Sequence, residues 1–216
     1  MVTNRNIDRI IRMLRREVAP WDEPIVGHYK ADAFATLISC LLSLRTKDAV
    51  TAVASQRLFA RARTPQTLLA LPIPTIERLI YPVGFYKTKA RTLHAVCREL
   101  LTRFDGRVPG DLDALLTIKG VGRKTATLVI TLAFRQQGIC VDTHVHRITN
   151  RWGYVRTRTP EETEMALRRT LPARYWQVIN DYLVSYGQHL CGPVSPWCSR
   201  CPIAFACARV GVRHAR

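Results

Sequence analysis

The sequence is short of acidic side chains and contains no long apolar run. Its 216 residues hold 33 Lys and Arg against 16 Asp and Glu, which gives a net charge of +17. Without an apolar run of bilayer length, and with 47% hydrophobic residues, we expect a soluble globular protein. The shortage of acid favours a polyanionic partner, because basic side chains that neutralise backbone phosphates release counterions. We therefore expect a nucleic acid partner rather than a merely solvated basic surface or an anionic membrane.

The start of the chain lacks the pattern of a secretory signal. Residues 7–18 predict an amphipathic helix, with apolar residues on one face and arginines elsewhere. A mitochondrial presequence is also rich in arginine, but Asp8 and Glu17 are unusual in such a segment. We therefore expect an ordinary terminal helix, and a cytoplasmic protein associated with the nucleoid.

No segment shows a convincing strand pattern, whereas helical spacing of apolar residues recurs along most of the chain. We therefore predict an all-α protein. Prolines bound the shorter helical pieces, because proline stops a helix. The predicted helices are 7–18, 31–44, 48–62, 65–71, 75–81, 87–104, 111–117, 123–134, 142–152, 160–170 and 174–190.

Two glycines, Gly120 and Gly122, form a tight turn between two apolar helical patterns. Glycine lets the backbone approach a ligand closely or take a positive φ. A helix that begins directly afterwards points unsatisfied N–H groups at an anion. Because Arg123, Lys124 and Thr125 follow, the turn favours a DNA-binding hairpin of two helices over a plain connection.

Lys124 and Asp142 each allow a simple and a catalytic interpretation. A lysine in a basic region often neutralises phosphate, but a helix N-terminus and nearby cations favour the neutral amine that a nucleophile requires. An aspartate before a helix is a common N-cap. Taken together, the two residues indicate an amine nucleophile beside a phosphate-binding turn, which suits chemistry on DNA.

Four cysteines near the end of the chain have the spacing C-x6-C-x2-C-x5-C. In a chain without a secretion signal, this pattern favours a metal site over disulfides. Zinc and an iron–sulfur cluster both remain possible, and the single Cys-x2-Cys pair favours the cluster. The remaining three cysteines lie among apolar residues and predict packed thiols. The four ligand candidates are Cys191, Cys198, Cys201 and Cys207, and the other three are Cys40, Cys97 and Cys140.

These motifs resemble those of the endonuclease III family, the DNA glycosylase and AP lyase branch of the helix-hairpin-helix glycosylases. The resemblance covers most of the chain, and residues 41–48 and 81–86 contribute to it. It implies a six-helix barrel at 24–137, an iron–sulfur domain formed by 1–23 and 138–216, and a DNA-binding groove between these two lobes. The implied cofactor is a 4Fe–4S cluster. The implied partner of the monomer is double-stranded DNA with damaged bases or abasic sites.

The resemblance also implies roles for individual residues. Lys124 is expected to attack the sugar C1′ and form a Schiff base, and Asp142 is expected to activate the amine. The implied substrates are oxidised or ring-saturated pyrimidines and abasic sites. Phe85 is expected to be an apolar wedge in the DNA, or else a core residue, and Thr143 and His144 are expected to help hold a phosphate.

Three positions depart from the family pattern. Arg45 stands where a glutamine usually fills the space left by the flipped base, which puts the opposite-base preference in question. Lys119 replaces the usual proline of the turn. The loop 192–197 lacks the basic residues often found there, so its phosphate contacts are expected at Arg200 or elsewhere.

Two alternatives remain beside the bifunctional enzyme. One is a mismatch-directed glycosylase of the same superfamily, acting on thymine or uracil opposite guanine. The adenine-mismatch glycosylases, a separate branch of the superfamily, carry a catalytic glutamate where this chain has Cys40 and usually lack the lysine. The other is a non-catalytic DNA-binding or redox-sensing iron–sulfur protein, which has no need of both Lys124 and Asp142.

Overall fold

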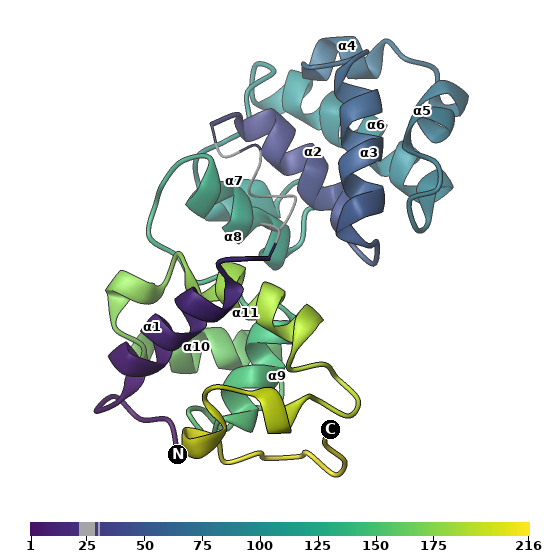
Figure 1. The fold of residues 1–216 in the computed structure, drawn as a ribbon. Coiled ribbons are helices and arrows are strands. Elements are labelled where there is room, and N and C mark those ends of the chain that lie inside the picture. The colour runs from purple at the N-terminus through teal and green to yellow at the C-terminus, as the bar shows by residue number, and fades with distance from the viewer. Residues whose placement is uncertain (22–28, 30) are drawn as a thin grey trace. The chain divides into compact units, whose positions relative to one another are not determined.

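The computed structural model describes residues 1–21, 29 and 31–216. Within these residues the secondary structure is helical and contains no strand, which confirms the predicted all-α class (Figure 1). None of the described helices is both long and apolar enough to cross a membrane. The chain divides into two compact units: unit 1 comprises residues 1–24 and 137–216, and unit 2 comprises residues 25–136.

Unit 2 is built around α2 (Ala33–Ser43), which is apolar on nearly every side. It packs against α3 (Asp48–Phe59), α6 (Tyr86–Arg103) and α8 (Arg123–Leu132), and its Leu37, Ile38 and Leu42 are fully buried. A helix with no polar face belongs in the middle of a core rather than at its edge. The helices of unit 2 are α2 (Ala33–Ser43), α3 (Asp48–Phe59), α4 (Pro65–Leu69), α5 (Ile73–Ile80), α6 (Tyr86–Arg103), α7 (Leu112–Leu116) and α8 (Arg123–Leu132).

Unit 1 joins the two ends of the sequence. The N-terminal helix α1 packs against α11, with Ile10 and Leu14 fully buried, and Trp152 and Tyr186 are the largest fully buried side chains of this core. The predicted amphipathic helix at 7–18 is therefore a core-forming helix with the predicted bounds. The α-helices of unit 1 are α1 (Ile7–Val18), α9 (Thr143–Arg151), α10 (Pro160–Thr170) and α11 (Ile179–His189), and its 3-10 helices are η2 (Ala173–Tyr175), η3 (Cys198–Arg200) and η4 (Ala204–Ala206).

The single helix predicted at 174–190 is wrong. The structure has the short η2 first, then a turn, and α11 begins only at Ile179. At this turn Nε1 of Trp176 donates a hydrogen bond to the carbonyl of Leu171 (2.8 Å), and its ring centroid lies 5.5 Å from the guanidinium carbon of Arg168. These contacts hold Trp176 against the preceding segment, and packing of this kind overrides the local helical pattern.

Candidate active site and DNA interface

Gly120 and Gly122 form the predicted turn, but only Gly120 is required by the fold. Gly120 has a φ of +95°, and a Cβ there would lie 2.7 Å from Cγ2 of Thr92. A Cβ on Gly122 would meet nothing within 4 Å. The turn is closed by a hydrogen bond from Val121 N to Ile118 O (3.0 Å). Gly122 is the N-cap of α8, which has no side-chain cap, so its backbone lies open to a ligand.

The first turn of α8 divides its residues between surface and core. Arg123 and Lys124 are exposed, whereas the side chains from Thr125 to Thr131 are buried. Thr125 is only 2% exposed, so a DNA contact from this residue would have to use its backbone N–H rather than its hydroxyl. The structure therefore places Arg123 and Lys124 on the surface and Thr125 in the core, although the three looked equivalent in the sequence.

Cys40 lies in α2, within the electrostatic reach of Lys124. The lysine charge acts on this thiol, but burial dominates and raises the pKa of Cys40 to about 12. A thiol with this pKa stays protonated and neutral near pH 7, so it is unsuited to the acid–base role of a carboxylate. Cys40, Cys97 and Cys140 are all buried, which confirms the prediction of packed thiols.

Asp142 caps α9, which confirms the simpler of its two interpretations. Its Oδ1 accepts hydrogen bonds from the backbone N–H groups of His144 (2.8 Å) and Val145 (2.9 Å). The side chain is 7% exposed. Capping does not compete with a catalytic role, because it fixes the orientation of the carboxylate. Lys124 belongs to unit 2 and Asp142 to unit 1.

His144 and Thr143 begin α9 beside the capping carboxylate. Thr143 is exposed, and the half-buried His144 ring meets the Arg147 guanidinium, with 3.1 Å between Nδ1 and Nη2. The ring lies against Gly187 of α11, where a Cβ would be only 2.2 Å from Nδ1. Sequence reasoning missed this glycine, because nothing in its neighbourhood signals that two helices approach so closely.

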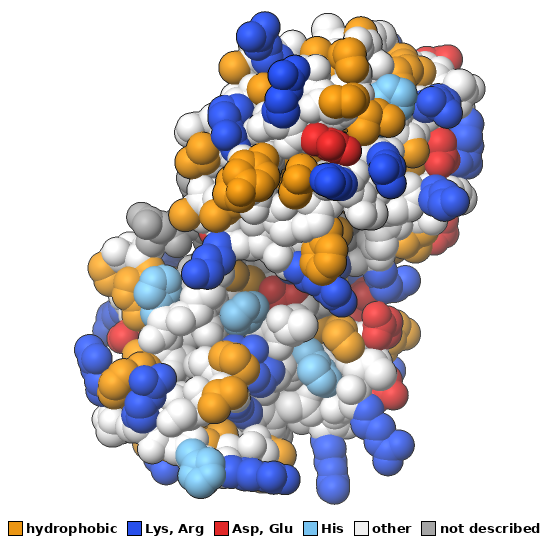
Figure 2. Space-filling view, turned by 90° about the vertical axis from the view of Figure 1, so that its right-hand side faces the viewer, with side chains coloured by type: hydrophobic (Ala, Val, Ile, Leu, Met, Phe, Trp, Pro, Cys, Tyr) orange, Lys and Arg blue, Asp and Glu red, His pale blue; other side chains and the backbone are white. Residues whose placement is uncertain are grey.

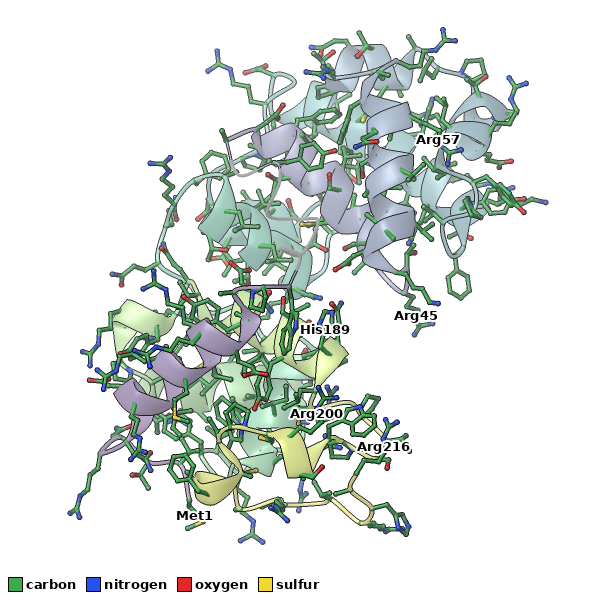
Figure 3. The ribbon with its side chains drawn as sticks, in the orientation of Figure 1. Met1, Arg45, Arg57, His189, Arg200 and Arg216 are labelled. Atoms are coloured by element: carbon green, nitrogen blue, oxygen red, sulfur yellow. The ribbon has the colours of Figure 1, made fainter. Side chains whose placement is uncertain are left out.

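Arg45 and Phe85 come together on the surface of unit 2, from the loop after α2 and the loop before α6. Both have left-handed backbone conformations, with φ values of 54° and 59°. The guanidinium of Arg45 lies 5.8 Å from the centroid of the Phe85 ring. Phe85 is 64% exposed, so its alternative interpretation as a core residue is wrong. Figure 3 shows Arg45 projecting from its loop away from the helices of the unit.

All four tail cysteines line one small apolar cavity in unit 1, with a volume of about 20 Å³. Hydrogen-bond partners already reach the sulfur atoms of Cys191, Cys201 and Cys207. Among the described residues, no three His, Cys, Asp or Glu side chains form a group arranged to hold a metal ion. The contacts are Arg151 Nη1 to Cys191 Sγ (3.3 Å), the Arg209 backbone N to Cys207 Sγ (3.4 Å), and Tyr186 Oη with Cys201 Sγ (3.0 Å).

Two arginines of α9 hold the loop that follows Cys191. Arg147 donates to the carbonyl of Cys191 (2.9 Å), and Arg151 donates to those of Gly192 and Pro193 (2.7 Å each). Burial lowers the pKa of Arg147, while the nearby Cys191 and, to a smaller extent, Asp142 oppose this shift. Arg147 and Arg151 are four residues apart, so their guanidiniums lie on one face of α9. This helix therefore links the capping carboxylate of Asp142 to the loop after Cys191.

All the charged side chains of the C-terminal segment are basic. Residues 191–216 contain no Asp or Glu. The guanidinium carbons of Arg200 and Arg216 lie 5.8 and 4.1 Å from a ring centroid of Trp197, and Arg216 Nε donates to the carbonyl of Ser195 (3.0 Å). Figure 3 labels the two arginines. Sequence reasoning named Arg200 as the substitute for a basic loop but missed Arg216, which tertiary contacts bring to the same place. Figure 2 shows Lys and Arg side chains across the visible face, with fewer acidic ones among them.

Comparisons with known proteins give the family of this chain. Residues 38–173 match the model of the HhH-GPD superfamily base excision DNA repair proteins. The endonuclease III of Thermotoga maritima is 44% identical over 181 residues, which are 84% of this chain and 85% of that protein. The match in sequence therefore extends through most of both proteins.

Solved structures of endonuclease III bound to DNA share the fold. A non-covalent endonuclease III–DNA complex has a TM-score of 0.87, and a trapped covalent endonuclease III–DNA intermediate with an estranged adenine has a TM-score of 0.85. Each is 32% identical and covers 97% of both chains. These findings confirm the resemblance drawn from the motifs: the chain belongs to the endonuclease III family of HhH-GPD base excision DNA repair proteins.

Proposed function

We propose that this protein is a base excision repair DNA glycosylase with AP lyase activity, and that Lys124 is its nucleophile. The observation that carries the proposal is the exposed position of Lys124 in the first turn of α8, directly after the glycine turn. Family membership supports the glycosylase and lyase activities. The proposed substrates are oxidised or ring-saturated pyrimidines and abasic sites in double-stranded DNA, on which the protein acts as a monomer inside the cell.

The proposed reaction begins with attack of the neutral Nζ of Lys124 on C1′ of the damaged nucleotide. The C1′–N bond breaks, its electrons leave with the base, and the base takes up a proton. As the sugar ring opens, O4′ gains a proton and the nitrogen loses its protons, which gives a Schiff base. Loss of a C2′ proton then expels the 3′ phosphate by β-elimination, and water releases Lys124.

Asp142 supplies the fixed negative charge in this scheme. Its carboxylate stabilises the cation that develops at the sugar and accepts a proton from the attacking amine. The two backbone hydrogen bonds from α9 hold its Oδ1, so little reorganisation is needed during the reaction. Thr143 and His144, which follow in the same helix, are proposed to contact a DNA phosphate.

We propose that backbone N–H groups and basic side chains bind the phosphates of the DNA. In unit 2 the contacts come from Gly120, Gly122, Arg123 and the backbone N–H of Thr125. The uncapped N-terminus of α8 supports this, because such a terminus binds anions. In unit 1 the basic segment 191–216 is proposed to bind further phosphates without reading sequence.

Arg45 and Phe85 are proposed to open the duplex. The exposed Phe85 ring would wedge between bases, and the guanidinium of Arg45 would fill the gap left by the flipped nucleotide. Because a guanidinium pairs best with the two acceptors of guanine, Arg45 also supports a preference for lesions opposite guanine. This preference is the feature shared with mismatch-directed glycosylases.

We further propose that Cys191, Cys198, Cys201 and Cys207 hold a 4Fe–4S cluster. The endonuclease III family carries an iron–sulfur cluster. The donor set fits in its chemistry, because four thiols line one cavity and hydrogen-bond donors reach the sulfurs of Cys191 and Cys207, although no three of the described side chains are already grouped around a metal position. When bound, the cluster would cross-link the C-terminal segment and offer a redox-active centre. Arg151 would offset the negative charge of the thiolates.

Borohydride trapping on duplexes with thymine glycol or an abasic site tests the proposal. Wild-type protein is expected to form a covalent adduct on both, and Lys124→Ala is expected to form none while still binding the duplex. Equal nicking by Lys124→Ala would contradict the nucleophile. An adduct at the abasic site alone would show a lyase that does not act on thymine glycol. A folded wild type that binds DNA but gives no adduct would support the non-catalytic alternative.

A further inference from the structure

Lys89 is a buried lysine near the start of α6 that the proposed chemistry leaves without a role. Its side chain is only 9% exposed. Nζ donates hydrogen bonds to the carbonyl oxygens of Leu42 (2.6 Å) and Leu44 (2.5 Å) and to Oγ1 of Thr46 (3.1 Å). All three acceptors are electrically neutral, so the ammonium is held by dipoles rather than by a carboxylate.

The partners of Lys89 lie on both sides of Arg45. Leu44 precedes Arg45 and Thr46 follows it, so the ammonium fixes the backbone at each end of this exposed residue. The backbone N–H of Lys89 donates to the carbonyl of Phe85 (2.9 Å). One residue therefore contacts the loop of Arg45 through its side chain and the loop of Phe85 through its backbone.

The two loops also contact each other directly at Thr46 and Gly84. The N–H of Gly84 donates to Oγ1 of Thr46 (3.2 Å), and a Cβ on Gly84 would lie 2.7 Å from the carbonyl oxygen of Arg45. Oγ1 of Thr46 thus joins Gly84 to Lys89. The close approach lets small displacements of one loop pass to the other.

Stability alone does not explain a lysine at this position. A buried ammonium loses much of its hydration, and burial lowers the pKa of Lys89 to about 8. An apolar side chain of similar length would avoid that desolvation cost. What the ammonium adds is three directed hydrogen bonds. Arg45 and Phe85 need such support, because left-handed residues other than glycine persist only where their surroundings fix them.

We propose that Lys89 is a positioning residue that holds Arg45 and Phe85 in the arrangement needed to extrude a paired nucleotide. The inference rests on the proposed function, and it assigns Lys89 to base flipping rather than to bond breaking. Flipping costs most for a paired base and least where pairing is already lost. Loss of the hydrogen bonds from Lys89 should therefore slow excision of a paired lesion more than incision at a preformed abasic site.

The test compares Lys89→Met with Lys87→Met, which removes the same charge from an exposed position of the same helix. Single-turnover rates are measured on one duplex with thymine glycol and on one with a preformed abasic site. For Lys89→Met we expect the ratio of the first rate to the second to fall roughly 10- to 100-fold, since a small misplacement has effects of this size. For Lys87→Met we expect the wild-type ratio.

A second pair of variants covers the case in which Lys89→Met does not fold, as judged by its thermal unfolding. Thr46→Val removes the shared hydroxyl and should lower the same ratio, whereas Thr46→Ser should restore it. An unchanged ratio in folded Lys89→Met, or in Thr46→Val, would overturn the inference, as would an equal fall in Lys87→Met. A wild type inactive on both duplexes would instead overturn the proposed function, and the inference with it.

Discussion

The two units differ in the exposure and hydrogen bonding of their proposed functional side chains. In unit 2, Arg45, Phe85 and Lys124 are exposed, and α8 begins without a side-chain cap. In unit 1, Asp142 is 7% exposed and accepts two backbone hydrogen bonds, and Arg151, also 7% exposed, holds the cysteine loop. Unit 2 thus offers groups to a ligand, whereas unit 1 builds its groups into its own structure.

This difference separates two kinds of substitution. Changing an exposed group of unit 2 should alter activity or DNA binding with little effect on folding. Changing a built-in group of unit 1 should lower stability as well, because its hydrogen-bond partners are left unsatisfied. Three sets of variants test this rule.

The largest effect is expected at Asp142, where charge and cap can be separated. Asp142→Asn retains the N-cap but loses the negative charge, so turnover should fall roughly 10²- to 10⁴-fold at nearly unchanged stability. Asp142→Ala should show the same loss of turnover and also lose about 1 kcal/mol of stability. Single-turnover kinetics and urea unfolding measure the two effects. A fully active Asn variant would reduce Asp142 to a helix cap.

A smaller effect, on stability, is expected at Arg151. Arg151→Met leaves the carbonyls of Gly192 and Pro193 without their donors, which should lower the free energy of unfolding by about 2–3 kcal/mol. The iron content per protein chain should also fall, because the loop that follows Cys191 loses two of the hydrogen bonds that hold it. Arg200→Met, which alters an exposed arginine of the same unit, is the control. Equal stability and equal iron content in Arg151→Met and Arg200→Met would contradict the proposed difference between built-in and exposed groups.

The smallest effect, and an exception within unit 2, is expected at the glycine turn. Gly120→Ala should cost about 1–3 kcal/mol of stability, because it combines a φ of +95° with a methyl group 2.7 Å from Thr92. Gly122→Ala should leave stability nearly unchanged but weaken DNA binding, since its methyl group would point to open space where a phosphate is proposed. Thermal unfolding and binding titrations distinguish the two. Equal DNA affinity for wild type and Gly122→Ala would remove the turn from the interface.

The sequence by itself determined the elements whose signals are local. Apolar periodicity gave helix 7–18 its bounds, and the glycine turn with Lys124 was visible because turn chemistry and helix starts involve neighbouring residues. Asp142 was recognisable as a cap for the same reason. The spacing of the four tail cysteines was visible as well, since ligands within one short segment need no knowledge of the fold.

Only the tertiary structure decided which distant residues meet. The local sequence around Lys89 does not distinguish it from the other lysines, and only the structure shows Nζ hydrogen-bonded to Leu42, Leu44 and Thr46, 43 to 47 residues away along the chain. The predicted helix 174–190 is interrupted where Trp176 bonds back to Leu171, and Arg216 meets Trp197 only through the path of the C-terminal segment. Burial and long-range hydrogen bonds depend on the packing of whole helices, and no local pattern encodes that packing.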